Sequence, residues 1–247
     1  MPQNEHTMAR LTPPEIVLTC EHASRRFPTE LGSLGLSAAQ RRSHIAWDRG
    51  AASLTRALAA ALGGSPLLAR YSRIVADLNR SPSHPRVVPR VAFGTPVPGN
   101  ARLTRAERAA RLARYHTPWR DHVYAVIARA VSAPAGCIHL SVHSFTPTLH
   151  GVERNADVGL LYDPQRVAER LLAGALRERL TGEGVAVRRN YPYRGTADGF
   201  TTWCRRRFPS TRYMGIEIEL NQRLVGRAGV QRRVVGSMAD VLGAWRP

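Results

Sequence analysis

The sequence predicts an α/β fold, in which helices cover both faces of a central, mostly parallel (mixed) sheet. Short apolar runs alternate with segments of helical periodicity along the chain, which is typical of three-layer α/β/α architectures. The 247 residues suffice to bury a large core, and 43% of them are hydrophobic. Because the sequence has neither an internal repeat nor a clear linker, we expect one domain over residues 15–247, preceded by a loose segment over residues 1–14.

The predicted strands are short apolar runs. They cover residues 16–20, 66–69, 74–77, 137–143, 158–162, 185–189 and 213–220. The helices are placed by capping boxes and prolines. A box at Ser37 predicts a helix to about residue 62, and a box at Thr104 predicts a segment that Pro118 interrupts and that resumes to about residue 131. Pro164 opens a helix to residue 180, and the last helix covers residues 230–242.

The net charge of +18 raises the question of nucleic-acid binding. All 36 basic residues are arginine, however, and total replacement of lysine indicates a coding bias rather than selection of a binding surface. The sequence also contains no zinc-finger, RRM or KH motif. We therefore expect no specific nucleic-acid partner and interpret the arginine clusters at 205–207 and 232–233 as solvated faces.

The sequence also bears on the cellular compartment. No apolar run approaches the roughly 18 residues that span a membrane, and no signal peptide is recognisable. The three cysteines, Cys20, Cys137 and Cys204, are an odd number without metal-binding spacing, which argues against a disulfide framework. We expect a cytoplasmic protein without a membrane partner.

Polar side chains come at or near the ends of three predicted strands. His22 follows the first strand, His143 ends the strand 137–143, and Glu219 lies near the end of the last strand. In open α/β sheets, ligands bind beyond the carboxyl ends of the strands. Two histidines and a carboxylate that meet there are the parts of a metal-dependent hydrolase, and zinc is the expected metal.

The third metal ligand and the base are less obvious. Asp48 lies four residues after His44, on the same face of the predicted helix, and is either a ligand or a carboxylate that faces the helix dipole. Glu217 and Glu219 share one face of the last strand, where two carboxylates are costly unless polar groups surround them. A purely structural role for this pair is therefore not expected.

Arginines near the strand ends suggest an anionic substrate, because a guanidinium binds a carboxylate through two parallel hydrogen bonds. Arg73 and Arg80 flank the predicted strand 74–77, and Arg154 precedes the strand 158–162. A structural pair with an aspartate is an equally good interpretation of Arg73. Asn100 and Tyr193 lie in predicted loops that could close on a small ligand, and the proline-rich stretch 81–100 has the length of a binding loop.

A cysteine mechanism is the alternative to a metal. Cys20 lies two residues before His22, and a Cys–His pair can act as a nucleophile. Cys20 sits within an apolar run, however, where a thiol is usually buried and inert. The metal interpretation is therefore preferred.

Taken together, the motifs resemble the N-formylglutamate amidohydrolase family. The most specific are Ser-Arg-x-x-x-Asp-x-Asn-Arg at 72–80 and His-Ser-Phe-Thr-Pro at 143–147. Further matches lie at 20–24, 44–50, 98–100, 154, 190–193 and 219–224, so the resemblance runs from about residue 15 to 225. It implies a fold like that of the zinc exopeptidases (phosphorylase/hydrolase-like), and the hydrolysis of N-formyl-L-glutamate to formate and L-glutamate in histidine degradation.

The resemblance also implies roles for individual residues. His143 is similar to a zinc-binding histidine of the zinc carboxypeptidases, and Glu219 matches a late glutamate that acts as the general base. The chain departs from the His-x-x-Glu pair of those enzymes, because Arg25 follows His22 at that spacing. The third ligand must therefore come from elsewhere, with Asp48 as the first choice and Glu21 as the second.

The sequence is compatible with alternatives for the metal, the substrate and the functional class. The metal is zinc or another divalent ion. The substrate is an N-acyl acidic amino acid, another N-acyl amino acid or a small peptide. A non-catalytic binder of acidic ligands or nucleic acid that has kept the fold is the alternative from a different functional class.

Overall fold

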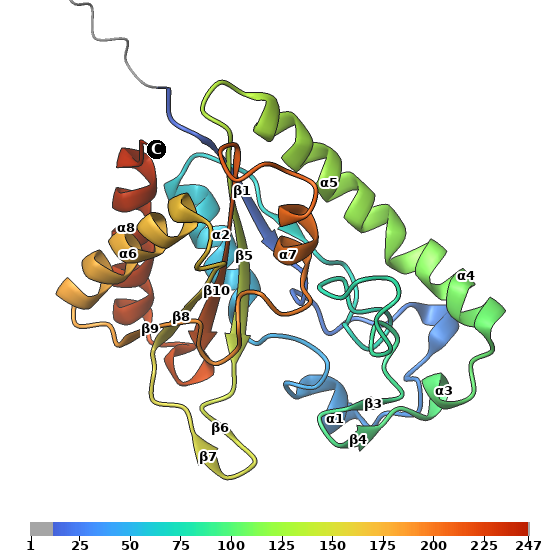
Figure 1. Ribbon diagram of the computed structural model, residues 1–247. Coiled ribbons are helices and arrows are strands. Elements are labelled where there is room, and N and C mark those ends of the chain that lie inside the picture. The colour runs from blue at the N-terminus through green and yellow to red at the C-terminus, as the bar shows by residue number, and fades with distance from the viewer. Residues whose placement is uncertain (1–11, 247) are drawn as a thin grey trace, which may run out of the picture.

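The computed structural model describes residues 12–246. It has three layers, with a six-stranded sheet between two layers of helices (Figure 1). The strands are β1 (Glu15–Cys20), β2 (Leu67–Leu68), β5 (Cys137–Phe145), β8 (Val158–Leu161), β9 (Val187–Arg189) and β10 (Tyr213–Asn221), in the spatial order β2-β1-β5-β10-β8-β9. Strands β2, β1, β5 and β10 run parallel to one another, whereas β8 is antiparallel to β10 and parallel to β9. The predicted mixed, mostly parallel sheet is confirmed.

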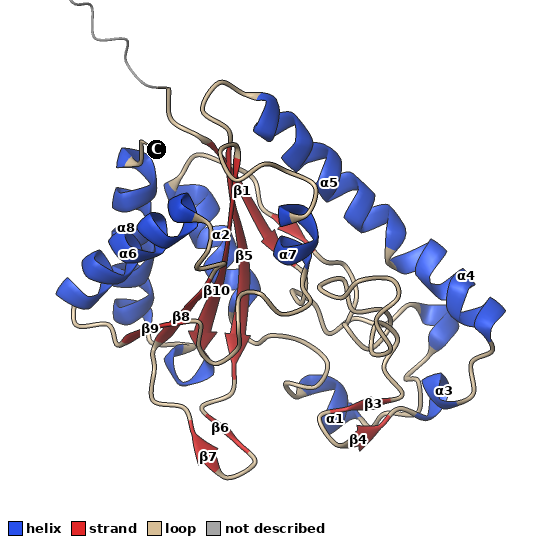
Figure 2. Ribbon diagram, in the orientation of Figure 1, coloured by secondary structure: helices blue, strands red, loops and turns tan. Residues whose placement is uncertain are grey.

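Helices cover both faces of this sheet (Figure 2). They are α1 (Ala38–Arg42), α2 (Ala51–Ala61), α3 (Pro98–Ala101), α4 (Arg105–Tyr115), α5 (Thr117–Ser132), α6 (Val167–Gly182), α7 (Phe200–Arg205) and α8 (Ala228–Ala244), with 3-10 turns at Thr29–Leu31 and Gln222–Leu224. On one side, α2, α6 and α8 pack on the sheet through residues such as Leu58, Leu176 and Met238. On the other side, α5 and α7 contribute Ile127 and Phe200.

The two faces of strand β5 differ in chemistry. Ile138, Leu140 and Val142 belong to the apolar core that packs against α2, α6 and α8. Because side chains alternate along a strand, His139, Ser141 and His143 share the opposite face with Cys137. All nine residues of β5 are buried, so the polar groups of this face must find partners within the protein. This alternation brings histidine and serine side chains into the interior.

Two small hairpins lie outside the main sheet and were not predicted. Strands β3 (Val91–Ala92) and β4 (Thr95–Pro96) form the first, and β6 (Thr148–Leu149) and β7 (Val152–Glu153) form the second (Figure 1). Because β8 is antiparallel to β10, it begins at the edge of the sheet where β5 ends. The connection 146–157, which carries the second hairpin, therefore stays at that edge and does not cross the sheet.

Some predicted elements differ from those observed. Residues 74–76 are buried and Asp77 is half-buried, but none of them forms a strand, because their amide groups bond locally or to the next loop: Val75 donates to the Ser72 carbonyl and Asp77 to that of Val87. The capping boxes at Ser37 and Thr104 are both present. The first opens only α1, however, and the helix resumes at α2 after Gly50, whose φ of 86° is left-handed. His44 thus lies in a turn and Asp48 in the irregular segment before Gly50, not on one helical face.

The start of α6 also differs from prediction, because this helix begins at Val167 rather than at Pro164. The prediction of a loose segment over residues 1–14 and one domain after it remains untested, and residues 1–11 lie outside the described part of the chain. Among the described residues, no helix combines the length and the apolar character required to cross a membrane. All three cysteines are free and buried.

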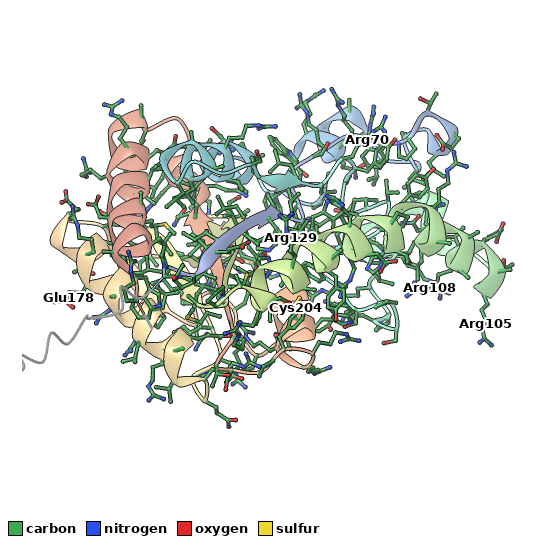
Figure 3. The ribbon with its side chains drawn as sticks, turned by 90° about the horizontal axis from the view of Figure 1, so that it is seen from above. Arg70, Arg105, Arg108, Arg129, Glu178 and Cys204 are labelled. Carbon is green, nitrogen blue, oxygen red and sulfur yellow. The ribbon has the colours of Figure 1, made fainter. Side chains whose placement is uncertain are left out.

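The arginines are spread over the surface helices and loops. Arg70 and Arg129 are exposed, and Arg105 projects from the start of α4 (Figure 3). The cluster 205–207 departs from the predicted solvated face, because Arg205 is buried and forms an ion pair with Glu169 on α6. Its guanidinium also donates to the carbonyl of Gly215 on β10. Arg205 therefore ties α7 to α6 and to the sheet.

Candidate active site

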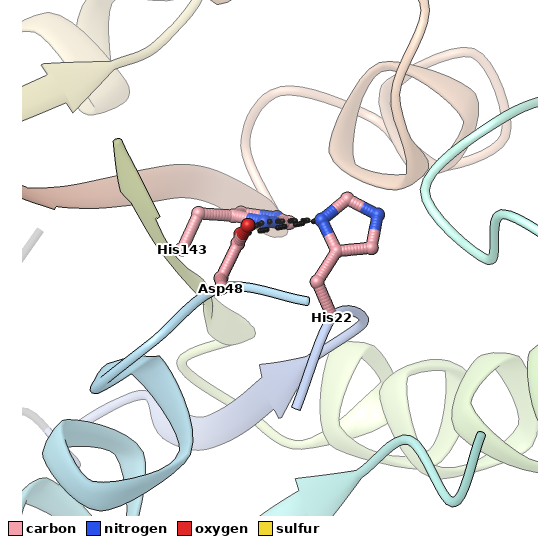
Figure 4. A group of neighbouring side chains, drawn as sticks. All are labelled: His22, Asp48 and His143. Atoms are coloured by element: carbon pink, nitrogen blue, oxygen red, sulfur yellow. Dashed lines mark hydrogen bonds and ion pairs between the residues drawn. The ribbon is translucent and has the colours of Figure 1, made fainter. Parts of the chain in front are cut away.

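Three potential metal ligands meet at the carboxyl edge of β1 and β5. His22 follows β1, His143 lies near the end of β5, and Asp48 comes from the turns between α1 and α2. The Nδ1 atoms of the two histidines lie 3.2 Å apart, and Oδ2 of Asp48 lies 3.2 Å from Nδ1 of His22 and 3.0 Å from Nδ1 of His143. Figure 4 shows the three buried side chains converging on one point. The structure thus brings the three predicted ligands together.

Contacts on both sides fix the position of Asp48. Its amide donates to the His22 carbonyl at 3.0 Å, and the Ser144 amide donates to its Oδ2 at 3.3 Å. Its Oδ1 forms an ion pair with Arg73. One carboxylate oxygen is thereby held against the histidines while a cation neutralises the other, as a buried carboxylate requires.

Ser141 and Glu21 determine which nitrogen of His143 carries hydrogen. The Ser141 hydroxyl donates to Oε2 of Glu21 at 2.7 Å, so its oxygen accepts from Nε2 of His143 at 3.0 Å. Oε2 of Glu21 lies 3.3 Å from the same nitrogen. Nδ1 of His143 is therefore the atom that faces Asp48 and His22. Glu21, the second choice for the third ligand, lies behind the ring, where carboxylates commonly orient metal-binding histidines.

His22 is arranged in the same way. Its Nε2 lies 2.7 Å from Oδ1 of Asp77, which leaves Nδ1 facing His143. Burial and the nearby charge of Arg73 lower the pKa of His22 to about 4, so the ring is neutral at pH 7. Burial acts to raise the pKa of Asp77, but the contact with His22 and the charges of Arg73 and Arg80 hold it well below the usual range. Asp77 is therefore an ionised acceptor.

A buried chain of hydrogen bonds connects Glu21 to the interior of the protein. Thr19 donates to Oε1 of Glu21 at 2.7 Å and accepts from Nε2 of His139 at 2.9 Å. Nδ1 of His139 then accepts from the Tyr213 hydroxyl at 2.8 Å. Burial lowers the pKa of His139 to about 4, consistent with a neutral ring. Although burial acts to raise the pKa of Glu21, its hydrogen bond to His143 and the charge of that ring lower it to about 2.

The geometry of the three ligand atoms fits a divalent metal ion. Tetrahedral zinc with bonds of about 2.0–2.2 Å places its ligand atoms about 3.3–3.6 Å apart, and the three observed separations of 3.0, 3.2 and 3.2 Å are slightly shorter. Two imidazole nitrogens and a carboxylate oxygen that face one another repel unless a cation or a proton lies among them. Burial acts to lower the pKa of His143, but Glu21 and the nearby Glu219 raise it to about 10, so a proton can take this place.

Glu219 lies beside these ligands on the neighbouring strand. It is the register partner of His143 across β5 and β10 and is only 5% exposed. Its Oε2 has no hydrogen-bond partner in the part of the chain that the structure describes. Burial and the charge of Glu217 raise the pKa of Glu219 to about 7, against an opposing effect of His143. Glu217 instead accepts a hydrogen bond from Thr201 at 2.6 Å. Glu219 is thus the carboxylate that is available to exchange a proton near neutral pH.

A cavity of about 580 Å³ opens in front of the converging ligands. Four of the five residues predicted to bind substrate line it: Arg73, Arg80, Arg154 and Tyr193. Arg80 and Arg154 form no ion pair with a carboxylate among residues 12–246, so their charges remain available to a ligand. Arg73 forms an ion pair with Asp48, which agrees with the structural interpretation considered for it, and it also lines the cavity.

Asn100 does not line the cavity. Its side chain is 1% exposed and donates to the carbonyls of Ile74 and Pro89, each at 2.9 Å, while its Oδ1 accepts from Arg111 at 3.0 Å. All of its hydrogen-bonding groups therefore serve to hold the stretch 81–100 in place. We assign Asn100 a structural role instead of the predicted one in substrate binding.

Several cavity residues were not identified from the sequence. Arg86 and Phe93 come from the stretch 81–100, and Arg194 follows Tyr193. The length of that stretch had indicated a binding loop, but not which of its side chains face inward. Cys20, by contrast, is fully buried and does not line the cavity. Burial raises the pKa of its thiol to about 12, so it is no nucleophile at neutral pH.

Comparison with known proteins identifies the family. The family model for N-formylglutamate amidohydrolase matches residues 15–225. The structure is similar to that of the gene product Atu2144 from Agrobacterium tumefaciens, with 34% identity and a TM-score of 0.82, covering 93% of this chain and 89% of the other. It also resembles N-formylglutamate amidohydrolase from Ralstonia eutropha JMP134, with 20% identity, a TM-score of 0.74 and 94% coverage of each chain. No functionally curated protein matches the chain. Because the family model spans most of its length, the chain belongs to the N-formylglutamate amidohydrolase family, whose members are hydrolases of amide bonds.

Proposed function

We propose that this protein is a metal-dependent amidohydrolase that cleaves the amide of an N-acyl acidic amino acid, with N-formyl-L-glutamate as the reference substrate. The observation that carries the proposal is the position of Glu219, a buried carboxylate whose Oε2 has no hydrogen-bond partner among residues 12–246. It lies beside three convergent ligand atoms in a cavity that arginines border. The family and the Ralstonia eutropha enzyme support the same class of substrate.

His22, Asp48 and His143 would hold the metal, and zinc suits a set of two nitrogens and one oxygen. When bound, such an ion polarises a carbonyl and lowers the pKa of water from about 16 to about 7. Asp77 and Glu21 contribute by keeping hydrogen on the Nε2 atoms, so that both Nδ1 atoms present lone pairs.

Glu219 would act as general base and then as general acid. It removes a proton from the attacking water as the oxygen adds to the carbonyl carbon, and it delivers that proton to the amide nitrogen as the C–N bond breaks. A carboxyl group with a pKa of about 7 suits both steps, because it exchanges protons readily at neutral pH. The products are a carboxylic acid and a free amino acid, which are formate and L-glutamate for the reference substrate.

Arg80 and Arg154 would bind the carboxylates of the substrate. Both guanidinium groups border the cavity, and neither forms an ion pair with a carboxylate among residues 12–246. Such contacts fix the amide in front of the metal ligands and raise the rate by positioning. Two such arginines favour an acidic amino acid, whose N-acyl derivative has two carboxylates, over a neutral one.

The first test is metal removal. Protein stripped with a chelator should release no formate from N-formyl-L-glutamate, and addition of zinc should restore activity. The measurement is formate production before and after zinc is added, with a parallel assay of L-glutamate. If neither acidic N-acyl amino acids nor peptides are cleaved in either state, the protein is a binder and the proposed activity is wrong.

The pH dependence of the reaction should follow Glu219. The base is active only when ionised, and its folded pKa of about 7 lies above the ordinary value of 4.5. A bound cation stabilises the carboxylate and moves this pKa downward. We therefore expect kcat/KM to rise with pH through a single ionisation that lies between 4.5 and about 7. An activity that falls over this interval as the pH rises would contradict the assignment of Glu219 as the base.

A further inference from the structure

Exposed apolar side chains gather at the mouth of the cavity. The large hydrophobic residues with high exposure in the described chain are Val91, Phe93, Val152, Val167, Leu171 and Tyr193. Three of these, Val91, Phe93 and Tyr193, line the cavity. Val152 belongs to the hairpin β6–β7, whose Leu149 also lines it. Exposed apolar patches beside a binding site commonly receive apolar ligand groups.

The two hairpins present their side chains in the same unusual way. Each has a two-residue turn in which both residues have positive φ: Phe93 (47°) and Gly94 (80°) in β3–β4, and His150 (50°) and Gly151 (77°) in β6–β7. This turn favours asparagine or glycine at its first position, and a bulky residue there is strained. Phe93 and His150 nevertheless occupy it, and both side chains line the cavity. Such strain is typical of functional positions.

Neighbouring side chains hold the aromatic rings at the mouth. His44 packs edge-on against Phe93, with ring centroids 5.1 Å apart, and the Arg73 guanidinium lies 5.9 Å from the centre of the same ring. The Arg154 guanidinium lies 5.5 Å from the ring of Tyr193. Arg73 and Arg154, which line the cavity, therefore also hold the aromatic rings at its entrance.

The cavity is also large for a formyl group. At about 580 Å³ it has the volume of sites that hold drug-sized ligands, whereas N-formyl-L-glutamate has only about a dozen non-hydrogen atoms and its acyl part is a single carbon with its oxygen. Arginines that bind the amino-acid carboxylates would leave the space between Val91, Phe93, Leu149 and Tyr193 unused by this substrate.

We propose that this space is a subsite for the acyl group, so that the preferred substrates are acidic amino acids carrying a large apolar acyl group, such as an aromatic one, instead of formyl. The inference rests on the proposed amidohydrolase function and specifies its substrate class. Phe93 and His150 line the cavity from the turns of the two hairpins, and Leu149 and Tyr193 contribute further apolar surface to it.

The test compares N-formyl-, N-acetyl- and N-benzoyl-L-glutamate with zinc-loaded protein. All three release L-glutamate, so one assay measures kcat/KM for each. We expect N-benzoyl-L-glutamate to exceed N-formyl-L-glutamate by about tenfold or more, the usual gain from filling an apolar pocket. The variant Phe93→Ala should lower the benzoyl-to-formyl ratio about tenfold, and Phe93→Leu should restore most of it. Leu171→Ala is the matched control, because Leu171 is an exposed apolar residue of α6 that does not line the cavity; its ratio should equal that of the wild type.

The outcomes separate the two proposals. Activity on N-formyl-L-glutamate with an equal or lower kcat/KM for the benzoyl compound would overturn the acyl subsite and leave the proposed function standing. A benzoyl preference that Phe93→Ala leaves unchanged would overturn the assignment of the subsite to the hairpins. Absence of glutamate release from all three compounds would overturn the proposed function, and the subsite with it.

Discussion

Replacement of Glu219 by glutamine should greatly reduce turnover while the protein keeps its metal. Glutamine has nearly the same shape but cannot accept a proton from water, and general-base catalysis contributes about 10²–10⁴-fold to rates. We therefore expect kcat to fall by about three orders of magnitude, with wild-type zinc content by elemental analysis, because Glu219 is not among the converging ligands. Near-wild-type turnover in Glu219→Gln would remove this residue from the base role.

A matched control lies two residues away on the same face of β10. Glu217→Gln removes an equivalent carboxylate, but Oε1 of Glu217 already accepts a hydrogen bond from Thr201. Its loss of kcat should be much smaller than that of Glu219→Gln. Equal losses in the two variants would show that the charge of the strand matters and not a specific base.

Glu219→Gln should also stabilise the metal-free protein at alkaline pH. The folded pKa of Glu219 is raised from 4.5 to about 7, so ionisation of the carboxyl destabilises the folded state as the pH rises above 4.5, and the full penalty is present above 7. Glutamine removes this penalty, which corresponds to up to about 3 kcal/mol. Thermal unfolding of the metal-free proteins at pH 5 and pH 8 should show the larger gain at pH 8.

Loss of His143 should eliminate the metal, whereas loss of Glu21 should only weaken it. His143→Ala removes one of three ligand atoms, so we expect no stoichiometric zinc and no turnover. Glu21→Gln keeps the ligand but weakens its orientation, and changes of this kind cost about 10–100-fold in metal affinity. Activity of Glu21→Gln should therefore recover at high zinc, and that of His143→Ala should not.

The measurement is zinc affinity by competition with a chromogenic chelator, followed by turnover as a function of zinc concentration. His122→Ala provides the control, because His122 is an exposed histidine of α5. Full zinc occupancy in His143→Ala would contradict the ligand assignment. Wild-type affinity in Glu21→Gln would show that the contact between Glu21 and His143 has no effect on the metal.

Much of the fold could be predicted because the central strands are buried on both faces. β5 and β10 contain regularly spaced apolar residues, and the capping boxes at Ser37 and Thr104 mark real helix starts. The predicted strand 74–77 was wrong for the same reason. Residues 74–76 are equally apolar and buried, yet they pack within a loop without strand partners. Periodicity reports burial, and burial alone does not distinguish a strand from a packed loop.

The site, too, could be predicted only in part. His22, Asp48 and His143 could be identified as candidate ligands from strand ends and motifs, because chain position indicates which side chains reach the edge of the sheet. Their partners could not, since the roles of Glu21 and Asp77 depend on the rotation of two imidazole rings. Asn100 failed as a prediction because the sequence does not tell whether a loop amide faces the cavity or the backbone behind it.

The antiparallel strand β8 has a consequence for how the enzyme can change. A parallel neighbour of β10 would need a crossover to the opposite edge, and the length of that crossover would be fixed by the sheet. Because β8 starts where β5 ends, residues 146–157 connect two points on one rim, and lengthening such a loop costs little free energy. The part of the cavity around His150 can therefore accept insertions, deletions or grafted sequences while the metal ligands and Glu219 stay unchanged. In this architecture, substrate range and catalytic chemistry can evolve as separate modules.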